Sequence, residues 1–237
     1  MAPIEYYLDE HVAVLTMKDG ENRFNYDFLD LFMKTLDEIE RGTDARTLVV
    51  TSAHEKIFCN GIDLEWLGGL IAREGRQAAL EFPKRLNALL RRILTYPLIT
   101  VAAINGHAFA GGAIMACCFD FRFMRTQRGF FCVPEVDIGI PFMPGMSAMM
   151  KKAIPMYKVM EMQLTGKRVT AEECEAHHIV VKACPVETLL EEALAFAMTH
   201  KKDRRMLGVM KNVLFKDLLQ IMDVDDPAYL AGGQTGL

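Results

Sequence analysis

Short apolar runs alternate with stretches of helical spacing along most of the chain. Residues 4–18 place apolar and polar positions alternately on both sides of a polar DEH, which predicts the two strands of a β-hairpin. Further runs of strand length occupy residues 47–53, 98–104 and 119–124. Strands that alternate with helices are typical of an α/β fold, and we predict that fold class here.

Two amphipathic helices are predicted between these strands. Residues 26–42 carry apolar side chains at helical spacing, and Gly42 is placed to end the helix. A second such pattern runs from about Glu81 to Leu94, shortly before the strand at 98–104. The apolar face of the first helix consists of Phe28, Leu31, Phe32, Leu36 and Ile39.

The pattern changes in the last third of the chain. Residues 170–178 predict a short helix capped by Thr170, and residues 179–185 predict a strand. Residues 186–222 have helical spacing almost throughout. We interpret the last fifteen residues, 223–237, as a poorly ordered or partner-dependent tail.

Composition and charge narrow the classes of function. The 237 residues are 51% hydrophobic and 24% charged, as in an ordinary globular protein, and the net charge of −4 disfavours nucleic acid as the main partner. The six cysteines include no Cys-x-x-Cys pair and no metal-ligand spacing, so we expect reduced thiols and no metal site. The sequence shows neither a signal segment nor an apolar run of membrane-spanning length, so we expect a soluble intracellular protein without a membrane partner.

Two glycine-containing segments carry the strongest indication of chemistry. Residues 103–115 (AINGHAFAGGAIM) join a strand to an apolar helix and contain no acid or nucleophile, and they match no nucleophile elbow, P-loop or dinucleotide-binding pattern. Such a turn presents free backbone N–H groups at a helix N-terminus, which suits a developing negative charge. Residues 58–66 (FCNGIDLEW) place Gly61 and Asp63 similarly. The alternative is that both segments are only structural turns.

Three segments in this order, FCNGIDL, INGHAFAGG and VPEVDIG, resemble the signature segments of the crotonase (enoyl-CoA hydratase/isomerase) superfamily. The resemblance covers roughly residues 5–200, and three ordered motifs are far more specific than one. It implies a crotonase-type spiral of repeated ββα units over residues 1–190 and a C-terminal helical region over residues 191–237. It also implies an acyl-CoA thioester as the substrate.

The resemblance further implies that the backbone forms an oxyanion hole. In the family two N–H groups hold the thioester carbonyl, and the matching donors here are Ile62 and Gly111. The matching catalytic base is Glu135. Hydratases carry a second glutamate where Ile114 stands, and dienoyl-CoA isomerases carry an aspartate near the position of Met143. One carboxylate therefore remains.

A single base suits one reaction in particular. It removes a proton from C2 of a 3-enoyl-CoA and returns it to C4, through a dienolate held by the two N–H groups. We therefore expect a Δ3,Δ2-enoyl-CoA isomerase, an intramolecular oxidoreductase that transposes C=C bonds in the β-oxidation of unsaturated fatty acids. Two alternatives stay open: an enoyl-CoA hydratase that uses Glu135 alone, and a non-catalytic acyl-CoA-binding member.

Further residues are expected to contact the substrate. Asp63 also fits a helix cap, and Lys56 and the basic cluster 201–205 are candidates for the CoA phosphates or simply a solvated surface. His107 fits a structural histidine, and Asp137 fits a salt bridge or cap, pointing away from Glu135 on an extended segment. The expected substrate-binding residues are Cys59, Gly61, Asp63, Leu64, Trp66, Gly112, Ile114, Pro134 and Phe142.

The resemblance also carries expectations about cofactor, assembly and location. No cofactor is expected, because CoA is part of the substrate. The family packs its C-terminal helices into trimers, so we expect a homotrimer, although this region is short here. The ending QTGL is not a Ser-Lys-Leu-type signal, so we predict the cytoplasm. Relatives generally carry glycine where His178 stands, so we expect this helix end to be shaped differently.

Overall fold

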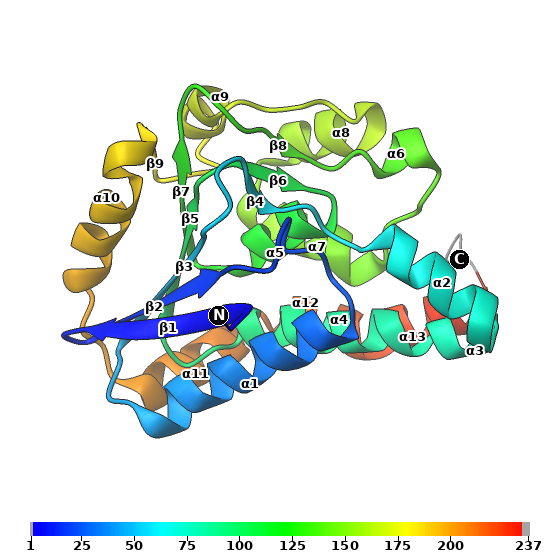
Figure 1. The fold of residues 1–237 in the computed structure, drawn as a ribbon, viewed down its shortest axis with the longest axis horizontal. Helices are drawn as coiled ribbons and strands as arrows, with labels where there is room; N and C mark the ends of the chain where they lie inside the picture. Colours follow the sequence, from blue (N-terminus) through cyan, green and yellow to red (C-terminus); the bar gives the residue numbers. More distant parts are fainter. Residues whose placement is uncertain (1, 234–237) are drawn as a thin grey trace.

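Two β-sheets form the centre of the molecule (Figure 1). The computed structural model describes residues 2–233. The larger sheet has six strands in the order β1-β2-β3-β5-β7-β9, and the smaller has three in the order β4-β6-β8. The strands are β1 (Ile4–Asp9), β2 (Val12–Met17), β3 (Thr47–Ser52), β4 (Ile57–Cys59), β5 (Ile99–Ile104), β6 (His107–Phe109), β7 (Phe121–Arg125), β8 (Phe131–Cys132) and β9 (Lys182–Cys184).

The strand pairing confirms the α/β prediction. β1 and β2 form the predicted antiparallel hairpin, and the other paired strands within the described residues are parallel. β3, β5 and β7 of the larger sheet are each followed by a strand of the smaller sheet and then by helices. This repeat of two strands and a helical segment is the predicted spiral of ββα units.

The helices agree closely with the spacing of apolar residues. Both amphipathic helices form at the predicted bounds, and Asn25, Asp63 and Thr170 cap helices through their side chains. The helices up to residue 176 are α1 (Tyr26–Gly42), α2 (Leu64–Glu74), α3 (Arg76–Ala79), α4 (Glu81–Leu94), α5 (Gly111–Cys118), α6 (Glu135–Ile138), α7 (Pro144–Ala153), α8 (Met156–Thr165) and α9 (Ala171–Ala176). Those that follow are α10 (Val186–Met198), α11 (Arg204–Leu214), α12 (Lys216–Gln220), the π-helix η1 (Ile221–Asp225) and α13 (Asp226–Ala231).

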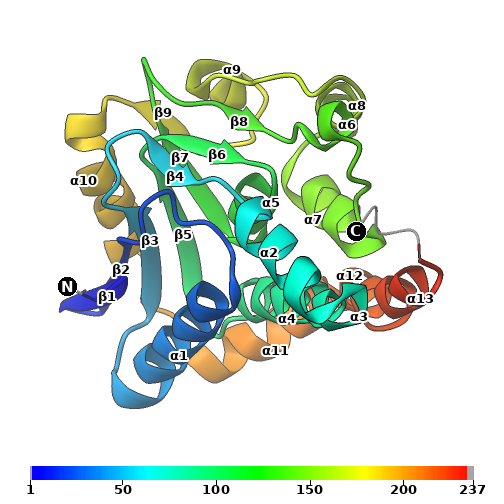
Figure 2. The same cartoon turned by 45° about the vertical axis from the view of Figure 1, so that its right-hand side comes forward.

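Helices cover both faces of the larger sheet, with α10 and α5 on opposite sides of it (Figure 2). Successive strand residues point to opposite faces. In β2, Val14 therefore packs in a cluster with α10, whereas the next residue, Leu15, packs in the main core with α1, α4 and α5. The domain boundary predicted after residue 190 falls inside α10.

The expectation of a poorly ordered tail over residues 223–237 is wrong as far as residue 233. This segment continues the helices as η1 and α13, and Asp226 is fully buried. Its carboxylate accepts hydrogen bonds from the backbone nitrogen of Gly145 (2.7 Å) and from Asn87 Nδ2 (3.0 Å). These bonds fix α13 against α7 and α4. Residues 234–237 lie outside the described part of the chain.

The helix end at His178 keeps a glycine-like conformation. His178 has φ +56, in the left-handed region that glycine adopts without steric cost. The backbone nitrogen of Ile179 donates to the carbonyl of Cys174 (2.8 Å), which closes the helix end. The chain therefore reaches β9 through a left-handed residue that carries a side chain.

Within residues 2–233, no helix has both the length and the apolar character needed to cross a membrane.

Candidate active site

The three sequence motifs meet at one edge of the smaller sheet. Its strands are parallel, so their C-terminal ends lie side by side: Cys59 pairs with Ala108, and Phe109 pairs with Cys132. Each motif continues directly from one of these ends. The sheet therefore brings together three segments, residues 58–64, 104–112 and 133–139, that are separate in the sequence.

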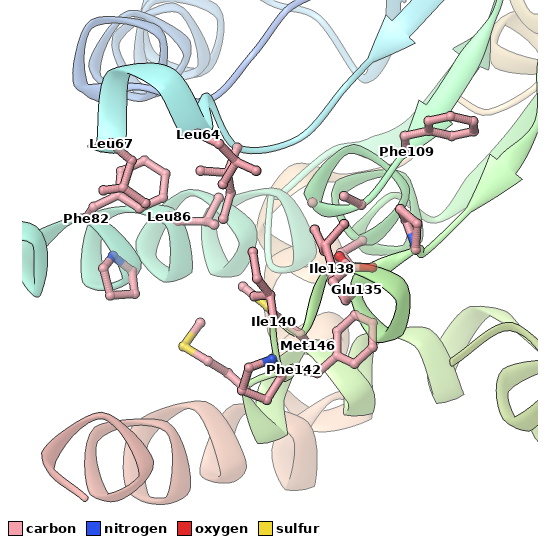
Figure 3. Close-up of a pocket in the computed structure, with 18 of the residues that line it drawn as sticks. Leu64, Leu67, Phe82, Leu86, Phe109, Glu135, Ile138, Ile140, Phe142 and Met146 are labelled. Carbon is pink, nitrogen blue, oxygen red and sulfur yellow. The ribbon is translucent and has the colours of Figure 1, made fainter. Parts of the chain in front are cut away.

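A cavity of about 260 Å³ lies at this edge (Figure 3). Its walls come from the loop before α2 and α2 itself, from α4, from the start of α5, from residues 134–146 and from α13. Figure 3 shows Glu135 and Phe109 on one side and Leu67 and Phe82 on the other. Most of the lining side chains are apolar; they include Leu64, Leu67, Phe82, Leu86, Phe142 and Met146.

The two glycine segments touch each other through their backbones. A Cβ atom added to Gly61 would lie 2.7 Å from the backbone nitrogen of Gly111, so this approach requires glycine. Gly61 also has φ +73, a left-handed conformation. Ile62 and Gly111, the two predicted N–H donors, both line the cavity. Neither backbone nitrogen donates a hydrogen bond to another atom of residues 2–233.

Hydrogen bonds on either side fix these two N–H groups in place. The carbonyl of Phe24 accepts from the backbone N–H of Asp63 (3.0 Å), and the backbone N–H of Phe24 donates to the carbonyl of Gly61 (2.7 Å). These two bonds hold Ile62, which lies between Gly61 and Asp63. On the other segment, the nitrogen of Ala110 donates to the carbonyl of Cys132 (2.9 Å). The arrangement therefore has the features of an oxyanion hole: donors from two loops that are fixed before a ligand arrives.

Cys59 and Gly112 form a second close backbone contact between the two segments. A Cβ atom on Gly112 would lie 2.2 Å from the carbonyl oxygen of Cys59. The Cys59 thiol donates to the carbonyl of Asn22 (3.0 Å), and burial raises its pKa to about 12. The thiolate is the reactive form of cysteine, so Cys59 acts by packing and not as a nucleophile.

Glu135 is the carboxylate of this cavity. It begins α6, is only 7% exposed, and its Oε2 has no hydrogen-bond partner within residues 2–233. Burial among apolar side chains raises the pKa of Glu135 from 4.5 to about 7, against a smaller opposing effect of its own backbone N–H. A carboxyl group with this pKa gains and loses a proton near neutral pH.

The two positions at which the resemblance implies an acid in members of other activities are apolar here. Ile114 and Met143 both line the cavity, and both are buried. Asp137 was expected to lie on an extended segment, which is wrong, because residues 135–138 form the helix α6. Its carboxylate lies against Gly166, where a Cβ atom would meet Oδ2 at 2.4 Å. Glu135 is therefore the acidic side chain that lines the cavity within the described residues.

One part of the cavity wall is polar. Arg23 and Asn60 line it, and both donate to the carboxylate of Glu21, from Nε of Arg23 at 2.8 Å and Nδ2 of Asn60 at 2.9 Å. The hydrogen bond from Asn60, followed by that from Arg23, lowers the pKa of Glu21. The sequence motifs gave no signal for Arg23, because it precedes them by more than 30 residues.

The predicted substrate-binding residues fall into two groups. Those that line the cavity are Leu64, Ile114, Pro134 and Phe142. Those that are not part of its lining are Cys59, Gly61, Asp63, Trp66 and Gly112. Asp63 Oδ1 caps α2 by accepting from the nitrogen of Trp66 (3.0 Å), and the Trp66 ring lies 5.5 Å from the ring of Phe82, centroid to centroid. Asp63 and Trp66 of this second group therefore help to position residues that line the cavity.

Sequence reasoning missed the walls that come from α4 and α13. Phe82 and Leu86 lie on the apolar face of α4, and that amphipathic pattern was the available signal. Tyr229 and Leu230 lie on α13, within the segment that the sequence predicts to be a tail. These two side chains reach the cavity because α13 packs against α4 and α7.

Other candidate residues lie outside the cavity. His107 Nδ1 accepts from the nitrogen of Phe130 (3.2 Å), a structural contact. Arg204, from the basic cluster, donates to backbone carbonyls at the end of α1, including that of Thr43 at 2.7 Å. Lys56 is exposed and is not part of the lining. Within residues 2–233, no group of three or more histidine, cysteine or acidic side chains is placed to hold a metal ion.

Comparison with known proteins agrees with this geometry. A profile of the enoyl-CoA hydratase/isomerase family matches residues 8–220. The chain belongs to this family. The resemblance predicted from the three motifs is thereby confirmed, and so is the crotonase fold.

Similar family members include proteins named as isomerases and as hydratases. The chain is 32% identical to "Enoyl-CoA delta isomerase 2, peroxisomal" of Arabidopsis thaliana over 185 residues, which is 77% of each protein. It is 33% identical to a "Putative enoyl-CoA hydratase" of Thermus thermophilus over 192 residues, 79% of this chain and 73% of that one. A solved probable enoyl-CoA hydratase from Mycobacterium tuberculosis shares the fold, with a TM-score of 0.88 at 23% identity, over 98% of this chain and 96% of that one.

The contact between Gly112 and Cys59 predicts a sharp difference between two glycine-to-alanine variants. Gly112→Ala forces the backbone of Cys59 away, and we expect it to lower the free energy of unfolding by about 3 kcal/mol. Gly68→Ala, in α2, meets no atom within 4 Å and is expected to be neutral or stabilising by up to about 1 kcal/mol. Chemical denaturation of both variants measures the difference. Equal stabilities would contradict the close contact.

The raised pKa of Glu135 predicts a pH-dependent stability. The folded state holds this proton more tightly than the unfolded state, so stability falls as pH rises from 4.5 to about 7. Glu135→Gln stays neutral and is expected to raise the free energy of unfolding by about 3 kcal/mol at pH 8 and by less than about 1 kcal/mol at pH 5. Denaturant titrations at the two pH values measure this. A gain that does not change with pH would show that Glu135 is not desolvated.

Proposed function

We propose that this protein is a Δ3,Δ2-enoyl-CoA isomerase that works with one base. The observation that carries the proposal is that Glu135 is the one carboxylate lining an apolar cavity, beside two backbone N–H groups that donate to no atom of residues 2–233. Membership of the enoyl-CoA hydratase/isomerase family and the similarity to relatives named delta isomerase support it.

The backbone N–H groups of Ile62 and Gly111 would hold the thioester oxygen of a 3-enoyl-CoA. Removal of a C2 proton moves negative charge onto this oxygen, and the resulting dienolate is delocalised from the oxygen to C4. A fixed donor of this kind contributes about 3 kcal/mol in the transition state. Because both donors are already in place, little reorganisation accompanies the appearance of the charge.

Glu135 would carry the proton between the two carbons. As a carboxylate it takes the proton from C2, and the electron pair of that C–H bond enters the dienolate. The carboxylic acid then returns the proton to C4, so the double bond moves from C3–C4 to C2–C3 and the base is regenerated. A pKa of about 7 lets one group perform both steps near neutral pH.

The same geometry disfavours the two alternatives. Hydration requires a positioned water as well as a proton, and the position of the second hydratase glutamate is occupied by Ile114. A protein that only binds acyl-CoA has no use for a buried carboxylate, which costs stability at neutral pH. The polar wall at Arg23 and Asn60 is the side on which we place the CoA part of the substrate.

The proposed reaction moves a proton within the substrate and changes no oxidation state of the protein, so it requires no cofactor.

We further propose a homotrimer. An exposed apolar face on α11 supports association with other copies of the chain; it consists of Met206, Val209, Met210, Val213 and Leu214. The cytoplasmic location stays a prediction, and two of the similar Arabidopsis proteins are named as peroxisomal.

Conversion of a medium-chain 3-enoyl-CoA tests the proposal directly, because the conjugated 2-enoyl thioester absorbs in the ultraviolet. We expect Glu135→Gln to lower kcat/KM by about 10³-fold, and the wild-type value to rise with pH to a plateau above about 7. Asp137→Asn, in the same short helix but outside the cavity lining, is the matched control and should keep its activity. Hydration of 2-enoyl-CoA without isomerisation would contradict the proposal and favour the hydratase alternative.

A further inference from the structure

A second hollow lies next to the cavity, on the other side of α13. It is a groove of about 620 Å³ between α3 and α4 on one side and η1 and α13 on the other. Figure 2 shows α13 beside α3 and α4. Its lining includes apolar side chains such as Leu80, Ala88 and Met222, and charged ones such as Lys84 and Arg91. The proposed mechanism does not use this groove.

Leu230 separates the two hollows. Among the described residues, it is the side chain that lines both the cavity and the groove. The side chain before it, Tyr229, lines the cavity, and the residue after it, Ala231, lines the groove. Leu230 therefore forms the wall between the apolar end of the cavity and the groove.

This wall is held firmly. The fully buried carboxylate of Asp226, four residues before Leu230, accepts hydrogen bonds from α7 at Gly145 (2.7 Å) and from α4 at Asn87 (3.0 Å). A Cβ atom on Gly145 would lie 2.4 Å from Asp226 Oδ2, so the two elements are in tight contact. Arg91 of α4 also pairs with Asp223 of η1. α13 is thus fixed at the elements that carry the other cavity walls.

We propose that Leu230 sets the upper limit of acyl chain length. The inference rests on the proposed function, because it takes the substrate to be an acyl-CoA with its thioester at Ile62 and Gly111. From there the acyl chain runs past Glu135 toward the apolar walls from α4 and α13, and its tip ends at Leu230. A smaller side chain at this position joins the cavity to the groove, and a longer chain then fits.

Titration calorimetry with saturated acyl-CoAs from butanoyl to hexadecanoyl tests the wall, because it measures Kd against chain length and these ligands undergo no turnover. Each buried methylene strengthens binding by about fourfold. For the wild type we expect Kd to fall with chain length and then to stop falling once the tip reaches Leu230. In Leu230→Ala the fall should continue over at least two more methylenes, which is about a 15-fold gain for the longest chains. Leu230→Trp should move the break to shorter chains.

Two further variants serve as controls. Ala88→Phe fills the groove from α4 without lining the cavity; alone it should match the wild type, and combined with Leu230→Ala it should cancel the gain. Leu164→Ala is a leucine truncation on α8, 69% exposed and outside both hollows, and should bind like the wild type. Circular dichroism and thermal unfolding establish that each variant is folded.

The outcomes separate this inference from the proposed function. The same length dependence in the wild type, Leu230→Ala and Leu230→Trp, or an unbroken fall of the wild-type Kd to hexadecanoyl-CoA, would overturn the role of Leu230. A break that moves as expected, in a protein that isomerises no 3-enoyl-CoA, would support Leu230 and overturn the isomerase alone. Failure to bind any acyl-CoA would overturn both.

Discussion

The constraint on which the rest of the structure depends is a carboxyl group held in an apolar cavity, with no cationic partner among residues 2–233. Desolvation places the pKa of Glu135 at about 7, so one group can accept and return a proton. That environment needs walls from α4, α5, residues 140–146 and α13, which lie far apart in the sequence. The raised pKa costs folding stability at neutral pH, as is common where a site is built for chemistry.

The smaller sheet brings the two backbone N–H groups and Glu135 to one place. β4, β6 and β8 are parallel neighbours, so the segments that follow them leave from one edge. The first two segments supply backbone N–H groups and the third supplies Glu135. The larger sheet and its helices then act as a rigid support. In the proposed mechanism the backbone stabilises charge and a single side chain moves the proton.

Much of this architecture could be predicted from the sequence, because it depends on local patterns. The helix at 81–94, the hairpin and the cap at Asp63 follow from apolar spacing and capping chemistry. The short helix at Glu135 and the fold of residues 223–233 could not be predicted in this way. Asp226 looks like a surface residue in an acidic segment, and only tertiary contacts with Gly145 and Asn87 bury it. Leu230 reaches the cavity for the same reason.

The most direct test of a single-base account is isomerisation in heavy water, with the position of the label read by mass spectrometry or NMR. If Glu135 removes the C2 proton and returns the same proton to C4 before it exchanges with solvent, most of the 2-enoyl-CoA formed in the first turnovers should carry no deuterium at C4. A product that carries one solvent deuterium at C4 in every molecule would show that the proton delivered to C4 is not the one that Glu135 took from C2. That result would contradict the account.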